Sequence, residues 1–383
     1  MKKLIITGVV AAMAFSSVAQ AELEISGNIT TGMAYQHDDK DAANTVAGAI
    51  GAGGVTQGDL SWAPTANADH FGWFVDQVEL DVESEFGENI RARADLDFYD
   101  LGTPSTVRGG ADAFFLEQAY VTANIAVGNG MEFLVGKFNA PVGLESVDRY
   151  ENVFSTYTPG WLFLTPKQVM GAKIYYDFND NWNFDLAVVN SLNNSLTGNS
   201  AYPSGLLRVG ANWGDEGRES FWHMALGFGP EHNTAAGQTS QNTHFDMLGS
   251  TWGNFAFGDY WDLGWEATYR QTNTLNGGAN QKALAGQLYV AYQASDVWSV
   301  QARGAAFWEI NPAGARGGSG ASTTGGTWSG FEGVTYSGSL AATYEITEDA
   351  DLLLEYRFDY ASTAGAALNA DFHTGVAQFA YSF

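Results

Sequence analysis

The chain has 383 residues, no cysteine and a formal net charge of −26 at pH 7. Because nucleic acid is bound by basic surfaces, this charge excludes nucleic acid as a partner, and the lack of cysteine excludes disulfides as a source of stability. The sequence contains 24 Phe, 17 Tyr, 12 Trp and 46 Gly but only 8 Pro, a composition that favours many strands and turns.

The amino terminus has the pattern of a secretory signal peptide. Two lysines precede an apolar run over residues 4–15, and small residues ending at Ala21 form a cleavage motif. A membrane anchor is the alternative, but the run is shorter than the roughly 20 residues that span a bilayer. We therefore expect residues 1–21 to be a cleaved signal peptide and residues 22–383 to form one exported domain.

Beyond this segment, apolar and polar residues alternate over many short stretches. Within 77–86, for example, acidic and amide side chains alternate with Val78, Leu80 and Val82, and the alternation resumes after a tight turn at Gly87. The pattern predicts sixteen strands, over residues 22–36, 77–86, 90–99, 114–125, 131–139, 169–178, 182–192, 205–213, 221–229, 242–257, 261–271, 283–294, 298–310, 334–346 and 351–360, with a terminal strand within 373–383.

Strands with one charged and one apolar face fit two fold classes. In a soluble β-sandwich the apolar face forms the core, whereas in an outer-membrane barrel it contacts lipid and the charged face lines a watery lumen. The connections distinguish the two classes, because short turns, as at Gly87 and Asp180, alternate with long loops, as at 37–69 and 312–333. This asymmetry, with aromatic residues beside the short turns, predicts an all-β, transmembrane antiparallel barrel of about sixteen strands.

The carboxyl-terminal stretch is amphipathic and ends on an aromatic residue. Phe379, Tyr381 and Phe383 share one face, and small or polar residues lie between them. In this feature the chain resembles bacterial outer-membrane β-barrel proteins, which finish on such a strand. The resemblance implies the outer membrane of a Gram-negative bacterium, contact with outer-membrane lipid and lipopolysaccharide, insertion by the barrel-assembly machinery, and a homotrimer.

Most basic residues of the predicted strands fall on the polar face. They should line the lumen, because a charge facing lipid near mid-membrane costs about 2 to 4 kcal/mol. The set comprises Arg91, Arg93, Lys173, Arg208, Arg270, Arg303 and Arg357. Lys137 instead shares parity with Phe133 and Val135, so either Gly136 marks a bulge that resets the alternation or Lys137 lies above the lipid.

The segment 136–168 is the most distinctive connection, and it carries Glu145, Asp148, Arg149 and Glu151. It resembles the third loop of Gram-negative porins, which folds into the barrel and narrows it, so these four residues are predicted to form a pore constriction. Its sequence GKFNAPVGLES and the following MGAKIYY strand are similar to the OmpL-like family of β-barrel porins. The segment departs from general porins in having no PEFGG-type tip, and an ordinary solvated external loop is the alternative.

No catalytic constellation is evident in the sequence. There is no G-x-S-x-G motif, and of the six histidines only His223 falls in the middle of a strand pattern, at lumen parity. We therefore expect no enzyme activity, no catalytic residue, no cofactor and no bound metal.

Together these patterns predict an outer-membrane porin for passive diffusion of small hydrophilic solutes and ions. Sixteen strands leave an aqueous channel. Acidic residues outnumber basic ones at lumen positions, which predicts a preference for cations. The alternatives are a substrate-selective channel or a non-conducting barrel with a structural or adhesive role.

Overall fold

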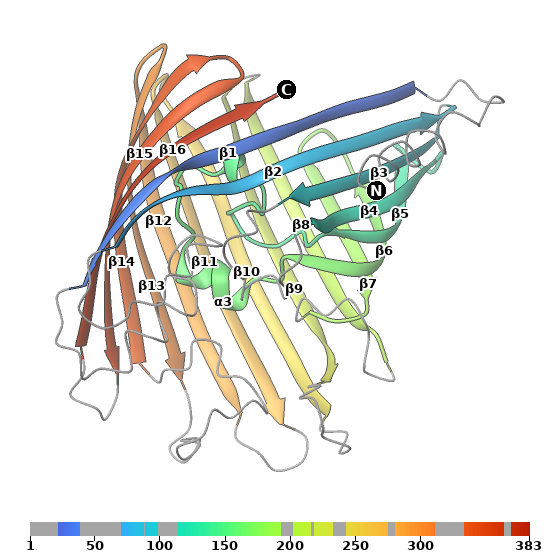
Figure 1. Cartoon of the computed structure of the whole chain (residues 1–383). Coiled ribbons are helices and arrows are strands. Elements are labelled where there is room, and N and C mark those ends of the chain that lie inside the picture. The colour runs from blue at the N-terminus through green and yellow to red at the C-terminus, as the bar shows by residue number, and fades with distance from the viewer. Residues whose placement is uncertain are drawn as a thin grey trace, which may run out of the picture.

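The described part of the chain forms one closed β-barrel, shown in Figure 1. The computed structural model describes residues 22–38, 70–87, 89–98, 114–192, 202–215, 218–232, 243–274, 280–310, 333–363 and 369–383. The predicted signal peptide over 1–21 and most of the predicted loop over 37–69 lie outside these residues.

Sixteen antiparallel strands each pair with their neighbours in the sequence, and the first pairs with the last. They are β1 (Glu22–Asp38), β2 (His70–Phe86), β3 (Ile90–Phe98), β4 (Phe114–Ile125), β5 (Met131–Asn139), β6 (Gln168–Asp177), β7 (Trp182–Val189), β8 (Ser204–Asp215), β9 (Arg218–His232), β10 (Thr243–Phe257), β11 (Trp261–Thr274), β12 (Gln281–Ser295), β13 (Trp298–Ile310), β14 (Gly333–Thr347), β15 (Ala350–Thr363) and β16 (Asn369–Ser382). Closure leaves no strand edge, which is the condition for a β-structure to span lipid, where unpaired backbone groups find no water.

Apolar side chains cover the outside of the barrel and polar side chains its inside. On β15, Leu354 and Tyr356 are 46% and 50% exposed, whereas Glu355 and Arg357 are 4% and 1% exposed. This distribution is the reverse of that in a soluble sandwich. The predicted fold class, with sixteen strands, is therefore confirmed.

The predicted strands differ from the observed ones mainly at their ends, most of all in β2. This strand begins at His70, well before the predicted start at residue 77. A register shift in its pairing with β1 leaves Asp76 and Gln77 both buried, at 5% and 1% exposed. A bulge of this kind breaks the period-two alternation on which the prediction depended.

Aromatic side chains lie beside the short turns, as the sequence predicted. Phe257 and Trp261 flank one turn with nearly parallel rings whose centroids are 6.2 Å apart, and the rings of Trp298 and Tyr344 are 4.8 Å apart beside another. Gly258 in the first of these turns has a φ of 58°, which glycine adopts without steric cost. Amphipathic rings at this level anchor a barrel at the membrane interface.

The connection between β5 and β6 contains a 3-10 turn, η1 (Arg149–Glu151), and a short helix, α3 (Pro159–Leu164). The Thr158 hydroxyl accepts from the backbone N–H of Trp161, and Pro159 occupies the first turn, where its missing N–H costs nothing. The helix lies inside the barrel against β11, β12 and β13 (Figure 1). Among the described residues, no helix is long and apolar enough to cross a membrane.

The seam between β1 and β16 ends on the terminal residue. Phe383 and Gly27 exchange two backbone hydrogen bonds of 3.0 Å. A Cβ added to Gly27 would lie 2.2 Å from the backbone oxygen of Glu79 on β2 and 3.0 Å from Cζ of the Phe383 ring. Glycine at this position therefore leaves room both for the backbone of β2 and for the terminal ring.

We expect deletion of Phe383 to reduce the yield of closed barrel several-fold, because it removes both of these hydrogen bonds, each worth about 1 kcal/mol, from the seam that closes the barrel. Gly27→Ala should also lower the yield, because the added Cβ would lie 2.2 Å from the backbone oxygen of Glu79 on β2. Gly375→Ala is the matched control on β16, since an added Cβ there meets nothing within 4 Å. The shift in gel mobility between heated and unheated protein measures closure, and a normal yield after deletion would contradict the role given to Phe383.

Candidate functional site

The connection 140–167, which we call the inner loop, crosses the inside of the barrel. Its helix buries Leu164 against Ala285 and Phe307, which are inward-facing residues of β12 and β13. The backbone N–H of Leu144 donates to Glu266 Oε2 of β11 at 3.1 Å. These contacts place the inner loop in the lumen and not on the outside of the barrel.

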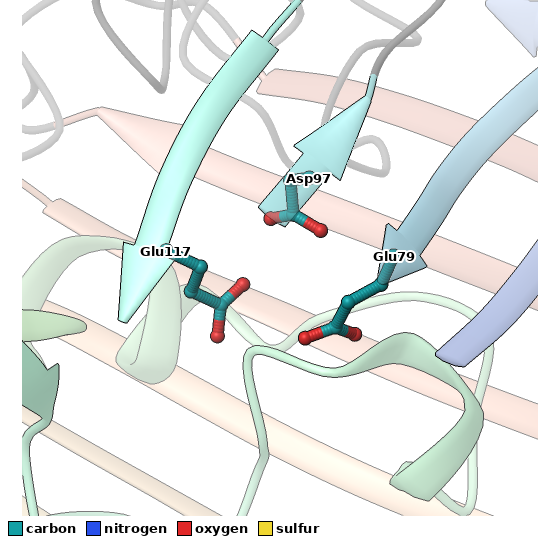
Figure 2. Close-up of side chains that lie close together, drawn as sticks. All are labelled: Glu79, Asp97 and Glu117. Atoms are coloured by element: carbon teal, nitrogen blue, oxygen red, sulfur yellow. The ribbon is translucent and has the colours of Figure 1, made fainter. Parts of the chain in front are cut away.

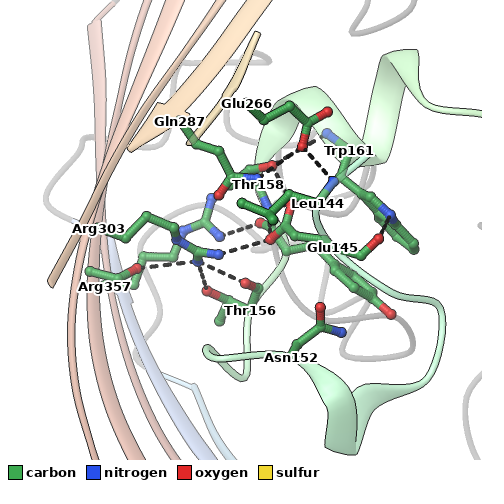
Figure 3. A network of polar contacts seen from close by, with 12 residues as sticks. Leu144, Glu145, Asn152, Thr156, Thr158, Trp161, Glu266, Gln287, Arg303 and Arg357 are labelled. Carbon is green, nitrogen blue, oxygen red and sulfur yellow. Dashed lines mark hydrogen bonds and ion pairs between the residues drawn. The ribbon is translucent and has the colours of Figure 1, made fainter. Parts of the chain in front are cut away.

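Glu145 and Arg303 form an ion pair between the inner loop and β13 (Figure 3). Arg303 Nη1 donates to Glu145 Oε1 at 2.8 Å, and Nη2 donates to the carbonyl and hydroxyl oxygens of Thr156 at 2.7 and 2.9 Å. The same carboxylate accepts from the backbone N–H of Thr158 at 3.0 Å. Arg303 is 6% exposed, so salt screens this pair weakly, and loss of Arg303 would leave the buried carboxylate of Glu145 without its ion-pair partner.

Two residues of β15 hold the next part of the inner loop. Glu355 accepts from the backbone N–H and the hydroxyl of Thr156 at 2.9 and 2.7 Å. Arg357 donates to the carbonyl oxygen of Tyr157. It also donates from Nε and Nη2 to the two carboxylate oxygens of Asp359 at 2.8 and 2.7 Å. This bidentate pair fixes the guanidinium in the orientation that reaches the loop backbone.

On its other side the inner loop is held by β2. Arg149 Nε lies 3.0 Å from Asp76 Oδ2, and the backbone N–H of Arg149 donates to Gln77 Oε1 at 2.9 Å. The Arg149 guanidinium lies 3.7 Å from the centroid of the Tyr157 ring, which stacks on Trp161 at a centroid distance of 3.6 Å. The inner loop therefore connects β2 with the wall formed by β11 to β15.

The three acidic residues of the inner loop differ in their surroundings. Asp148 is buried on the β2 side, where burial and the charges of Glu151 and Asp97 raise its pKa to about 7. Glu151 is exposed on η1 and lines a cavity of about 210 Å³ together with Glu145 and Arg303. Of the three loop acids, Glu145 is the one that forms an ion pair with Arg303.

Every basic residue predicted to line the lumen lies on the inner face with a carboxylate within ion-pair distance. The pairs are Arg91 with Glu132 (3.0 Å), Arg93 with Asp95 (2.7 Å), Lys173 with Asp185 (3.4 Å), Arg208 with Asp185, Arg270 with Asp246 (2.8 Å), Arg303 with Glu145 (2.8 Å) and Arg357 with Asp359 (2.7 Å). Such pairing offsets much of the basic charge of the wall, although Lys173 and Arg208 share Asp185, so the other lumen carboxylates gain influence over its potential.

Several inward carboxylates were not identified from the sequence pattern, among them Asp76, Glu117 and Asp246. Asp76 and Glu117 each lie next to another buried residue, Gln77 and Gln118 respectively, because register shifts put both neighbours on the inner face. The period-two pattern gives no signal for such pairs. Asp246, which is 0% exposed, keeps the normal alternation and could have been found from its parity.

The structure resolves the two alternatives for Lys137. Its side chain is 3% exposed and its ammonium donates to the carbonyl oxygen of Leu116 on β4, so it does not lie above the lipid. Gly136 has a φ of 146°, while the pairing of β4 with β5 keeps its register through this residue. The alternation is therefore reset by a glycine backbone conformation and not by an inserted residue.

Two cavities border the inner loop. One of about 300 Å³ is lined by loop residues together with Arg208 and Trp252 of the wall. The other, of about 210 Å³, is lined by further loop residues and by wall residues that include Tyr289. Leu144 and Glu145 line both cavities, so this part of the loop lies between two solvent-accessible spaces of the lumen.

One family model matches nearly the whole chain. It is described as "Putative beta-barrel porin-2, OmpL-like" and matches residues 22–383. No curated protein matches the chain.

Several solved structures of outer-membrane porins are similar in fold. The anion-selective porin from Comamonas acidovorans is 13% identical with a TM-score of 0.63, and the match covers 95% of this chain and 100% of that one. The trimer form of OmpT from Vibrio cholerae is 12% identical with a TM-score of 0.60, over 95% and 99%. OmpF from Salmonella typhi in complex with daunomycin is 11% identical with a TM-score of 0.58, over 94% and 97%. At such identities the likeness concerns the fold alone.

We expect Arg303→Ala to loosen the inner loop, because Glu145 then keeps a buried charge without its partner. Breaking a buried pair in this way costs about 3 to 5 kcal/mol in proteins where it has been measured, enough to raise the rate of trypsin cleavage after Arg149 or Lys167 by at least about ten-fold. Arg93→Ala is the control, since it removes an ion pair within the wall. Equal cleavage of the wild type and Arg303→Ala would contradict the tether.

Proposed function

Because the chain belongs to the OmpL-like family of beta-barrel porins, we propose that it forms a water-filled channel in the outer membrane for passive diffusion of small hydrophilic solutes and ions. The observation that carries this proposal is the inner loop, held on both sides of the lumen and bordered by two cavities. Sixteen strands enclose an aqueous channel, and a loop fixed inside it sets the size limit for solutes. In this proposal Glu145 and Glu151 border the constriction, and Asp148 and Arg149 shape it from the β2 side.

The channel, in our proposal, prefers cations. The basic wall residues are paired with acids, whereas the hydrogen bonds that Glu266 accepts come from the neutral groups of Leu144, Thr268 and Gln287. Carboxylates in a narrow, low-dielectric passage concentrate cations. The anion-selective porin from Comamonas acidovorans has a similar fold, so the side chains and not the fold must set the sign of selectivity.

Assembly belongs to the same proposal. The family and the fold point to a channel rather than an enzyme. We propose cleavage after Ala21, insertion by the barrel-assembly machinery and an environment of outer-membrane lipid and lipopolysaccharide. Phe379 and Tyr381 are 38% and 40% exposed beside the seam between β1 and β16. This exposure supports a role for these two residues, together with Phe383, in barrel assembly. The trimer form of OmpT from Vibrio cholerae supports a homotrimer.

A substrate-selective channel is the second candidate, and the larger cavity favours it. There Trp161 and Trp252 lie with Lys167 and Arg208 around a space of about 300 Å³. Aromatic faces beside basic groups suit a solute with one apolar face and one anionic group. Saturation of the ion current by such a solute would distinguish this candidate from a general channel.

We expect the reversal potential across a planar bilayer in a salt gradient to show several-fold cation preference in dilute salt. The preference should weaken as salt rises, because the screening length falls from about 10 Å at 0.1 M to about 3 Å at 1 M. The triple variant Glu145→Gln, Asp148→Asn, Glu151→Gln should reduce it.

The matched control removes the same number of charges from exposed short turns, with Asp180→Asn, Asp259→Asn and Asp296→Asn. This variant should keep the wild-type potential. Anion preference of the wild type in dilute salt would overturn the proposed selectivity, and equal potentials for the loop variant and the turn variant would overturn the role of the inner loop in it.

A further inference from the structure

The larger of the two cavities beside the inner loop has the size and the apolar lining of a small-molecule site. Its volume of about 300 Å³ is at the lower end of the range for such sites, about 300 to 1,000 Å³. Val147 and Trp161 of the inner loop and Trp252 of β10 contribute apolar surface to it, and both tryptophans are 4% exposed. A cavity of this volume and lining suits a solute with a single ring.

Arg208 of β8 lies over Gly210 and borders this cavity. Its Nε donates to Asp185 Oδ2 on β7. A Cβ added to Gly210 would lie 2.9 Å from Arg208 Nη1 and 2.7 Å from Cδ2 of His223, so both side chains occupy the space that a larger residue would fill. Arg208 and His223 both line the cavity. Glycine at position 210 therefore leaves room for the guanidinium beside His223, at the edge of the cavity.

Positive charge is in excess around Arg208. Lys173 Nζ lies 3.4 Å from Asp185 Oδ1, so Lys173 and Arg208 share a single carboxylate. These three residues together carry a net positive charge. A net charge beside an apolar lining is screened less than one in open water, so it favours an anionic group in the cavity.

The charged residues of the lining itself have the same balance. Lys167 and Arg208 are basic and Glu145 is acidic. Glu145 forms an ion pair with Arg303 of the wall. Lys167 Nζ lies 3.8 Å from the centroid of the Trp161 ring, which places a further positive charge beside the aromatic lining.

The buried carboxylates on the other wall strands do not line this cavity. Glu79, Asp97 and Glu117 lie together on β2, β3 and β4, as Figure 2 shows. Asn139, which does line the cavity, donates from Nδ2 to Glu117 Oε1 at 2.9 Å. The acidic group therefore contacts the lining through an amide, which carries no net charge.

His223 of β9 offers a further polar group next to Arg208. It pairs directly with Gly210 of β8 and with Trp252 of β10, and its ring meets that of Trp252 edge to face, with centroids 5.4 Å apart. Its Nε2 is buried and has no hydrogen-bond partner among the described residues. Buried polar atoms without a partner are rare in folded proteins and point to a water or a ligand.

We propose that this cavity binds a small aromatic carboxylate, with the carboxylate at Arg208 and His223 and the ring against the apolar side chains of the inner loop and Trp252. A planar guanidinium matches the two oxygens of a carboxylate. A neutral sugar would leave the positive charge unmatched, and an inorganic anion would leave the apolar lining in contact with water.

This inference rests on the proposed channel function and specifies the solute of its substrate-selective form. A local site for an anion is compatible with a preference of the whole channel for cations. The preference reflects the summed charge along the lumen, whereas the site depends on the few groups around Arg208.

The test is calorimetric titration of sodium benzoate into the purified full chain in detergent at neutral pH. We expect saturable uptake of one benzoate per chain. Benzyl alcohol keeps the ring without the charge, and acetate keeps the charge without the ring. Each should bind at least about ten-fold more weakly than benzoate, because each lacks one of the two interactions.

Two variants test the position and the charge of Arg208. Arg208→Gln removes the guanidinium, while Lys173 stays beside Asp185 and keeps that carboxylate paired. Gly210→Ala changes no charge, but its Cβ would displace the flexible end of Arg208. Each variant should weaken benzoate binding by at least about ten-fold, because hydrogen bonds between ionised groups are the strong ones.

Arg93→Gln and Gly304→Ala are the matched controls. Arg93 is a wall arginine of β3 that pairs with Asp95 away from the cavity, and a Cβ added to Gly304 meets nothing within 4 Å. Both controls should bind benzoate as the wild type does. The shift in gel mobility on heating checks that every variant forms a closed barrel.

No saturable uptake by the wild type would overturn the site, as would equal affinity for benzyl alcohol or wild-type affinity in both Arg208→Gln and Gly210→Ala. The ion current of the wild type in a bilayer without benzoate tests the channel separately. A protein that conducts but does not bind benzoate refutes the site and leaves the channel, whereas one that binds benzoate but carries no current refutes the channel and leaves the site.

Discussion

The structure depends on the satisfaction of backbone hydrogen bonds in a medium without water. In lipid a strand edge cannot be left unpaired, so the sheet must close, and closure requires Gly27 of β1 and Phe383 at the end of β16 to meet. Once closed, the barrel has an outer face that contacts lipid and an inner face that contacts water. The inverted distribution of side chains follows from this constraint, because charges are tolerated on one face alone.

Inside the barrel, buried ionic contacts act together with apolar clusters, such as that of Leu164, Ala285 and Phe307, in holding the inner loop. Ion pairs such as Arg303 with Glu145 and Arg149 with Asp76 connect the inner loop to two parts of the wall. Desolvation offsets much of the attraction in such pairs, so their main effect is to select one position for the loop. A loop held in one position gives the lumen a defined shape and a defined arrangement of charges, and both are what a channel needs for selection among solutes.

The sequence predicted those parts of the structure that depend on local alternation. The alternation of residues such as Leu354 and Arg357 identified the strands and the face to which each side chain belongs. It could do so because a charged side chain on the lipid-facing side destabilises a membrane barrel. The alternation gave no correct prediction where the strands are irregular. Register shifts turn Asp76 and Glu117 inward, and the backbone conformation of Gly136 turns Lys137 inward. Contacts such as Arg303 with Glu145 join residues 158 positions apart, and no local pattern carries that information.

The proposed channel function requires a continuous aqueous path through the barrel, past the inner loop. Single-channel recording of the purified protein in a planar bilayer measures such a path. We expect discrete current steps whose size grows with salt concentration without saturating, and larger steps for Arg303→Ala than for the wild type. Protein that inserts into the bilayer as a closed barrel and yet carries no current would contradict the proposed channel function.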